Sequence, residues 1–282
     1  MRFLQRPLRR LAEPYVFFPL IAVVLLAVIW GATVDMIRVD RALAERAAVS
    51  STQEVADTYE AQVVRALREI DQTLRLVKFA WERSGGRVDI AQLREKGLLL
   101  PELLFSTRIA DAGGNVVAST HSGAPRIAAG EAWFRRAAES DALVVGVPRR
   151  DPADGEWKID FSRRLEWPDG AFAGAVEISV AASYFVSGYE PARLGRHGVL
   201  AILGADGVFR ARRTGDAVSI GPLADYDDVV HGDSADAAPA LAWNPWDNVE
   251  RYTVARPLFE FPLAVVVGLE RAEQLAPARA RA

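Results

Sequence analysis

The sequence predicts an α+β protein in which an N-terminal transmembrane helix and a long helix precede two lobes of antiparallel sheet. Three observations lead to this prediction. An uncharged run fills residues 14–34, an unbroken helical periodicity follows over residues 35–83, and the pattern of strand, acidic-glycine turn and strand then occurs twice. We therefore expect a membrane anchor, a connecting helix and two lobes, in that order.

The first element is a basic tail, residues 1–13, followed by the apolar run. The tail holds one acid and four arginines, Arg2, Arg6, Arg9 and Arg10. The 21 residues of 14–34 match the length that crosses about 30 Å of hydrocarbon, and the arginines place the tail in the cytoplasm. A cleaved signal peptide is the alternative, but its apolar region is normally only about 7–15 residues long. We expect a single-pass anchor in a bacterial inner membrane, with most of the chain in the periplasm.

The second element is a helix over residues 35–83, which contains no proline or glycine. It would be about 70 Å long at 1.5 Å per residue. Apolar side chains recur at spacings of three and four, at Val63, Leu67, Ile70, Leu74, Val77 and Trp81. This pattern fits either a dimer seam or a helix that packs along its own domain, and we expect a homodimer.

Composition excludes several functional classes. The net charge of −3, with arginines scattered among acids, gives no basic surface for nucleic acid. The absence of cysteine excludes disulfides and thiolate metal sites, and it suits a periplasmic location. No nucleophile elbow, phosphate-binding lysine loop, zinc-protease motif or dinucleotide fingerprint is present. We expect neither cofactor nor metal, and no enzymatic activity of the chain by itself.

The first lobe begins after the glycines that follow the long helix. The pattern predicts helices at 89–96 and 130–138. Alternating apolar residues bounded by turn residues predict strands at 104–110, 115–119, 143–147, 157–165 and 171–180. A crossing helix at 181–189 leads to the second lobe. There the expected strands are 197–203, 208–212, 249–256 and 263–269, with a long polar loop at 214–239.

A resemblance to a known family is carried by residues 157–165 and 168–174. The segments 194–198, 206–208 and 262–269 add to it. Together they resemble the double Cache, or tandem PAS-like, extracytoplasmic sensor region of bacterial membrane-bound signalling proteins. The diguanylate cyclase-linked type is the nearest likeness, and the resemblance covers roughly residues 14 to 275.

The resemblance implies a sensor with a membrane-distal lobe at 84–189 that binds a small ligand, and a membrane-proximal lobe at 190–271. A C-terminal tail, 272–282, would lead toward a missing second span, beyond which relatives carry a cyclase or kinase output domain. We expect either a truncated product or a sensor that acts through a partner.

The same resemblance implies where the ligand binds. Amino-acid-binding members carry an arginine two positions before a Trp-Tyr pair, and an acid on a later strand. The matching positions here hold Glu131, Trp133, Phe134 and Glu177, so the usual donor to a ligand carboxylate is missing. The expected ligand is a small molecule, with amino acids or carboxylates as the candidate classes.

The chemistry of the residues points to the same region. A ligand site needs apolar walls and a few fixed polar groups. The predicted walls are Trp133, Phe134 and Trp157, and the predicted charges are Lys158, Asp160, Arg163 and Glu177. An ordinary core explains the aromatic residues equally simply, and a solvated strand face explains the charges.

Other features are weaker. Five aspartates and one histidine lie in one loop, and they fit either a divalent-cation site or a flexible acidic loop; they are Asp225, Asp227, Asp228, His231, Asp233 and Asp236. Trp243 and Trp246 fit a second pocket or a loop that closes over the proximal lobe. The main alternative function is a single-span envelope scaffold that docks a protein partner, for which an exposed apolar patch would be the sign. A secreted enzyme is a third alternative.

Overall fold

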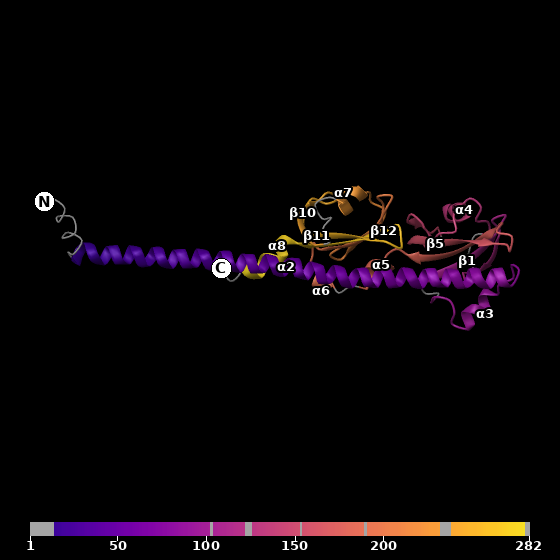
Figure 1. Ribbon diagram of the computed structural model, residues 1–282, viewed down its shortest axis with the longest axis horizontal. Helices are drawn as coiled ribbons and strands as arrows, with labels where there is room; N and C mark the ends of the chain where they lie inside the picture. The colour runs from indigo at the N-terminus through magenta and orange to yellow at the C-terminus, as the bar shows by residue number, and fades with distance from the viewer. Residues whose placement is uncertain are drawn as a thin grey trace. The chain divides into compact units, whose positions relative to one another are not determined.

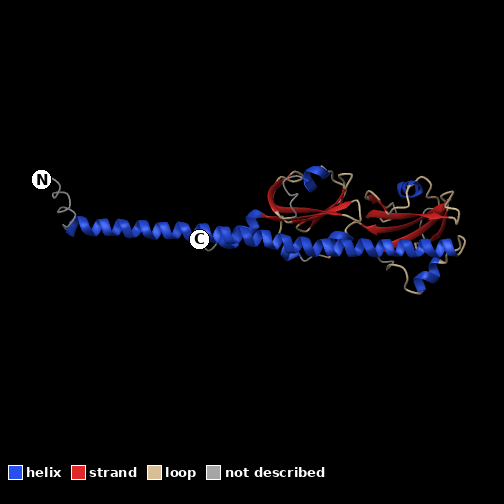
Figure 2. Cartoon of the chain, viewed as in Figure 1, coloured by secondary structure: helices blue, strands red, loops and turns tan. Residues whose placement is uncertain are grey.

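The computed structural model describes residues 14–101, 104–121, 126–152, 154–188, 191–231 and 238–279. The chain divides into two compact units, Met1–Ala48 with Ala272–Ala282, and Val49–Arg271. The fold is mixed helix and sheet, with a long N-terminal apolar helix followed by antiparallel sheets in two lobes, as Figures 1 and 2 show.

The helix α2 (Pro14–Arg83) is 70 residues long and includes the apolar run. Leucine, isoleucine and valine side chains of this run are exposed, and by length and composition α2 is apolar enough to cross a membrane. Pro19 lies inside the helix, near its start. The helix ends where Gly85 and Gly86 adopt the left-handed conformation with φ of +62° and +87°.

The distal lobe, as the resemblance names it, is built on a six-stranded antiparallel sheet. Its strand order is β2-β1-β6-β5-β3, with β4 paired to β5. The strands are β1 (Phe105–Asp111), β2 (Val116–Ser119), β3 (Val144–Val145), β4 (Arg149–Arg150), β5 (Trp157–Glu166) and β6 (Phe172–Ala181). Three short helices accompany it: α3 (Ile90–Glu95), α4 (Ala132–Glu139) and α5 (Tyr184–Ser187). The predicted hairpins β1–β2 and β5–β6 are both present.

The proximal lobe contains a second antiparallel sheet, in the order β10-β11-β12-β7-β8-β9. Its strands are β7 (Val199–Gly204), β8 (Phe209–Thr214), β9 (Ala217–Ser219), β10 (Ala240–Asn244), β11 (Val249–Leu258) and β12 (Leu263–Glu270). Its helices are α6 (Pro191–Leu194) and α7 (Tyr226–His231). Helix α8 (Arg271–Arg279) follows β12, and all of it beyond Arg271 belongs to the first compact unit.

The apolar seam of α2 lies in the core of its own chain. The side chains of Leu67, Ile70, Leu74 and Val77 are fully buried and Val63 and Trp81 nearly so, in one cluster with residues of both sheets. Of the two interpretations of this periodicity, packing along the chain's own domain is therefore confirmed for these residues. A dimer seam through them is wrong, because their surface is already buried within the chain.

Ion pairs connect α2 to both sheets. Asp71 accepts a hydrogen bond from Arg163 of β5 at 2.6 Å, and Glu60 accepts one from Arg256 of β11 at 2.7 Å. Asp71 is 14% exposed and Arg163 11%, so water screens this pair less than an ordinary surface pair. Each sheet therefore has its own polar attachment to the helix, beside the shared apolar core.

The prediction of a long polar loop over residues 214–239 is wrong in part. It contains β9 and α7, and Asp225 begins α7 by accepting hydrogen bonds from the backbone N–H groups of Asp227 and Asp228 at 3.0 and 3.2 Å. Acids at a helix N-terminus satisfy its free N–H groups, which accounts for part of the acidic cluster without a metal. Asp233 and Asp236 lie outside the described residues.

Candidate functional site

A cluster of buried charges occupies the face of the distal sheet that α4 covers. The side chains of β6 alternate between the two faces: Val176 and Ile178 join the α2 core, whereas Ala175 packs with Trp133 of α4. Glu177 shares the α4 face and is fully buried. In the strand register it lies opposite Arg108 of β1 and Ser162 of β5.

Arg108 is held by two carboxylates. Its Nη2 donates to Oε1 of Glu177 at 2.8 Å, and its Nε donates to the other oxygen of the same group. The outer edge of the guanidinium donates to Glu131 through Nη1 at 3.0 Å and Nη2 at 2.9 Å. Because both contacts use two parallel N–H groups, the arginine is fixed in one orientation.

A second arginine approaches from β4. Arg149 binds Asp160 of β5 through Nε and Nη2, and its Nη2 lies 3.9 Å from Oε1 of Glu177. Ser179 of β6 donates to Asp160 at 2.7 Å. The two arginines and three carboxylates thus form one connected group, with Arg149 one-third exposed at its rim.

Helix α4 supplies the apolar wall of this group. The ring of Trp133 lies 5.3 Å from the Arg108 guanidinium, and Trp133 Nε1 donates to Glu131 at 2.9 Å. Phe134 packs edge-on against Trp133 and against Phe172 of β6, at 5.7 Å in each case. Glu131 stands at the N-cap of α4 but makes no side-chain cap hydrogen bond, because its carboxylate turns to Arg108 instead.

Burial perturbs the acid–base chemistry of the group. Burial, together with the nearby charge of Asp160, raises the pKa of Glu177 to about 8, although Arg108 and Arg149 act in the opposite direction. Burial alone would lower the pKa of Arg108, but its hydrogen bonds to Glu177 and Glu131 raise that pKa above its ordinary value. The group carries one excess negative charge when every member is ionised, and it is neutral when Glu177 is protonated.

We expect the melting temperature to fall between about pH 5 and pH 8 because of Glu177. A folded-state pKa near 8 means that the folded chain retains a proton that an ordinary unfolded carboxyl has released, so this stabilisation is complete below the ordinary pKa and is lost as the pH rises through 8. Glu177→Gln removes the titration and should flatten the dependence in calorimetric scans from pH 5 to 9. The exposed Glu54→Gln is the matched control, and equal slopes in wild type and Glu177→Gln would contradict the assignment.

The structure brings four of the seven sequence-predicted residues together: Trp133, Phe134, Asp160 and Glu177. Lys158 lies on β5, as Asp160 does, but it binds Asp151 and Asp154 at 2.7 and 2.8 Å. Arg163 points to the other face, where it binds Asp71 of α2, and the one-third-exposed Trp157 stands at the start of β5. The role of all seven as ligand contacts stays a prediction.

Two residues of the cluster were missed by sequence reasoning, Arg108 and Arg149. A guanidinium does lie at this position, because Arg108 of β1 donates to Glu131. A charged residue between Thr107 and Ile109, at the centre of a predicted apolar strand, was the available signal, because such a residue must face water or find a partner. Arg149 lies in a two-residue strand and has no comparable signal.

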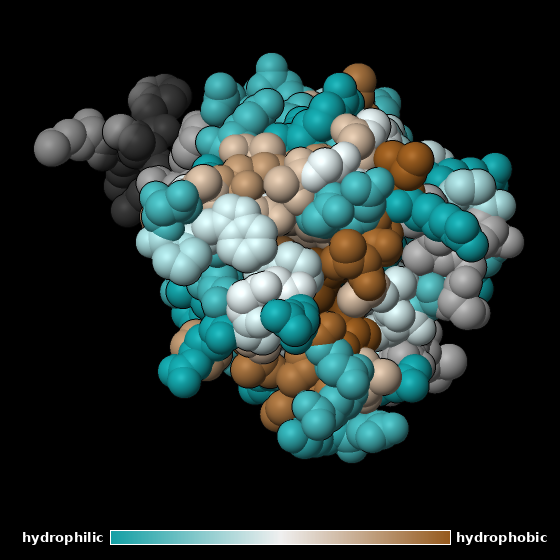
Figure 3. Space-filling model, turned by 90° about the vertical axis from the view of Figure 1, so that its right-hand side faces the viewer, coloured by the Kyte–Doolittle hydropathy of each residue, from teal (hydrophilic) through white to brown (hydrophobic). Residues whose placement is uncertain are grey.

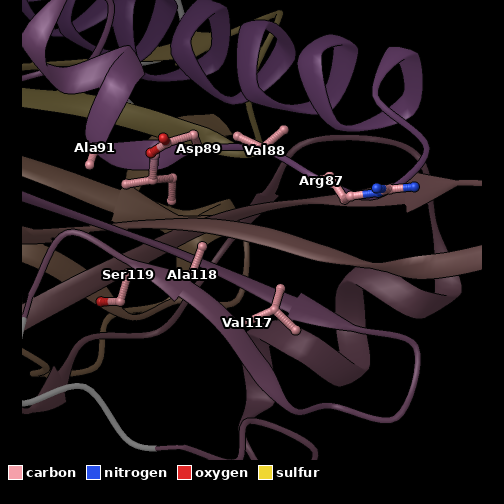
Figure 4. Close-up of a pocket in the computed structure, with 8 residues that line it drawn as sticks. Arg87, Val88, Asp89, Ala91, Val117, Ala118 and Ser119 are labelled. Carbon is pink, nitrogen blue, oxygen red and sulfur yellow. The ribbon is translucent and has the colours of Figure 1, made fainter.

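An open surface hollow of about 470 Å³ lies elsewhere in the same lobe. The residues around the start of α3 and those of strand β2 line it, namely Arg87, Val88, Asp89, Ile90, Ala91, Val117, Ala118 and Ser119 (Figure 4). None of these residues belongs to the charged cluster. The end of the molecule in Figure 3 also shows apolar residues gathered into a patch within a hydrophilic surface.

Comparison with known proteins identifies the fold. No family model matches the sequence, and no curated protein matches it significantly. Among solved structures, the extracellular domain of the histidine kinase rpHK1S-Z16 aligns with a TM-score of 0.64 at 20% identity, covering 79% of this chain and 95% of that one.

Two Campylobacter jejuni chemoreceptor domains align as well. The periplasmic sensory domain of Tlp1 gives a TM-score of 0.61 at 9% identity, covering 83% of this chain and 99% of that one. The ligand-binding domain of Tlp3, in complex with L-valine, gives 0.54 at 10% identity, covering 83% and 97%. Together with the two-lobed architecture, these likenesses show that the chain has the fold of the extracellular sensor domains of histidine kinases and chemoreceptors.

Proposed function

We propose that this chain is a membrane-anchored extracytoplasmic sensor whose distal lobe binds a small ligand beneath α4. One observation supports this most: two arginines and three carboxylates are gathered on one sheet face against the Trp133 ring. Burying such charges costs several kcal/mol unless each is well paired, so a fold without a use for them would more simply carry apolar residues there.

The ligand class that fits this group is an amino acid. A zwitterion carries both an ammonium and a carboxylate, and the cluster offers carboxylates for the first and guanidinium groups for the second. Of the two carboxylates that bind Arg108, Glu131 is 25% exposed and Glu177 is fully buried, so the oxygens of Glu131 are the ones that a ligand carboxylate would replace on Arg108. The Tlp3 domain, which shares the fold, was crystallised with L-valine.

The proposed topology follows from the charge of the N-terminal region. Residues 1–13 form a cytoplasmic tail, residues 14–34 span a bacterial inner membrane and the rest lies in the periplasm. Residues 35–83 connect the span to a distal lobe at 84–189 and a proximal lobe at 190–271, and 272–282 form the C-terminal tail. We propose a homodimer that signals to a cytoplasmic output, a diguanylate cyclase or a kinase domain.

The proposed mechanism is a shift between two arrangements of the lobes. A ligand moves this equilibrium only by as much as its affinities for the two arrangements differ. Helix α2 packs in one core with residues of both sheets. A ligand that alters the packing of α2 against the distal sheet would therefore act on the same helix that leads toward the membrane.

A thermal-shift screen of the full chain in detergent, against amino acids and small carboxylates, tests the proposal. A ligand at about 100 times its dissociation constant should add roughly 2.7 kcal/mol of stability. Trp133→Ala should abolish the shift by removing the apolar wall of the site. Trp243→Ala, at a 62% exposed position of the proximal lobe, is the matched control and should retain it. A screen in which no compound shifts the midpoint would overturn the amino-acid proposal.

A protein-docking scaffold is the second candidate. The apolar patch of Figure 3, together with exposed apolar residues such as Val117 in the surface hollow, favours it. The two candidates differ in the same screen, because a scaffold would show no small-molecule shift and Trp133→Ala would alter stability alone.

A further inference from the structure

The proximal lobe carries a second polar group within its sheet, on the face whose core contains Ala201, Phe209 and Val266. This core is separate from the one that holds α2. Arg212 shares the face, because it lies opposite Ala201 in the register of β7 and β8. Arg251 of β11 is the largest fully buried side chain among the described residues.

Arg251 is well satisfied. It donates from Nη1 to Oδ1 of Asn244 at 2.7 Å, from Nη1 and Nη2 to Asp247 at 2.8 and 2.7 Å, and from Nε to the backbone oxygen of His197 at 2.6 Å. Asn244 donates in turn to Thr253 at 3.0 Å, and both are only 3% exposed. The group is therefore a rigid, prearranged frame around the β10–β11 turn.

Two hydrogen-bond donors beside this frame have no acceptor among the described residues. They are Nη1 of Arg212 and Nε1 of Trp246, and both atoms are buried. Both side chains border Phe209: the Arg212 guanidinium lies 5.3 Å over its ring and Trp246 packs edge-on at 5.4 Å. Buried donors are nearly always paired, so two at one ring mark a place where an acceptor belongs.

The charges around these donors favour an anion. Asp247 binds Arg251 through both oxygens, and the only hydrogen bond described for the Arg212 guanidinium goes to the neutral Ser219 hydroxyl, at 3.1 Å from Nε. Burial lowers the pKa of Arg212; the charge of Asp247 raises it and that of Arg251 lowers it further. One positive charge of the pair Arg212 and Arg251 thus lacks a carboxylate of its own.

We infer that the proximal lobe binds a small carboxylate between Arg212 and Trp246. Its oxygens accept from Nη1 of Arg212 and Nε1 of Trp246, and its apolar part lies against Phe209. An anion with a short apolar or aromatic tail fits these groups, because the donors are flanked by two aromatic rings. This site is independent of the distal cluster and shares no residue with it.

Titration calorimetry on the full chain in detergent tests the inference, with acetate, propionate and benzoate as probes at constant ionic strength. Benzamide is the neutral counterpart of benzoate. The expected result is saturable binding of at least one carboxylate and none of benzamide. Arg212→Gln should weaken binding roughly tenfold or more, because it removes a charge-assisted hydrogen bond.

Trp246→Phe is the gentler variant, since it keeps an aromatic ring and removes only the indole N–H. It should weaken binding about fivefold, the equivalent of one hydrogen bond. Trp243→Phe, at a 62% exposed position of the neighbouring β10, is the matched control and should bind as wild type does. The inference is overturned if no carboxylate binds, if benzamide binds as well as benzoate, or if Trp246→Phe and Trp243→Phe bind alike.

Discussion

Replacing Arg108 by methionine is expected to lower the free energy of unfolding by about 3–5 kcal/mol. The substitution leaves the fully buried Glu177 without its bidentate partner, and it deprives Glu131 of the same group. Removing one member of a buried ion pair is costly because the remaining charge has neither water nor a counter-ion. Chemical denaturation of the full chain in detergent, at pH 8.5 and at pH 5.5, would measure the effect.

Two further variants isolate the cause. Arg108→Met combined with Glu177→Gln should recover most of the loss, because the second change removes the orphaned charge. Arg68→Met, which breaks an exposed bidentate pair with Glu260 on the same chain, should have little effect. The single variant should also lose less at pH 5.5, where Glu177 is protonated, than at pH 8.5. Equal losses in the single and double variants would contradict this account.

Truncating Leu74 to alanine is expected to lower the free energy of unfolding by about 2–5 kcal/mol. Leu74 is fully buried in the core that α2 shares with the sheets, so its removal leaves a cavity as well as lost apolar contacts. Phe79→Ala, at a 57% exposed position of the same helix, is the matched control and should cost far less. Denaturant titration of both variants gives the comparison.

The concentration dependence of that titration separates two causes. A residue in the chain's own core destabilises to the same extent at every protein concentration, whereas a residue at a subunit interface would show a loss that depends on concentration. We expect no concentration dependence for Leu74→Ala. A strong dependence would restore the dimer-seam interpretation of this periodicity.

Much of the architecture was predictable because it rests on periodicity and turn chemistry. The hairpin β5–β6 was evident from two alternating apolar runs on either side of Pro168-Asp169-Gly170. The end of α2 was equally evident from Gly85 and Gly86, which adopt the left-handed backbone that glycine tolerates best. These signals are local, so no knowledge of the tertiary fold was required.

The missed parts depend on tertiary context. Strand β10 contains exposed residues such as Leu241 and Trp243 on an edge of the sheet, and its pairing with β11 is what makes it a strand. Arg108 was missed because its partners, Glu131 and Glu177, lie 23 and 69 residues away. The same limit applies to the partner of Arg163, because Asp71 lies on a helix 92 residues earlier.

The central position of β6 has a consequence for how the two faces of the distal sheet are coupled. Glu177 belongs to the charged cluster, and its immediate neighbours Val176 and Ile178 belong to the core packed on α2. Successive residues of a strand are separated by about 3.3 Å, so the two faces communicate across a single peptide bond. A displacement of this strand would reach the helix directly, without a relay of intervening side chains.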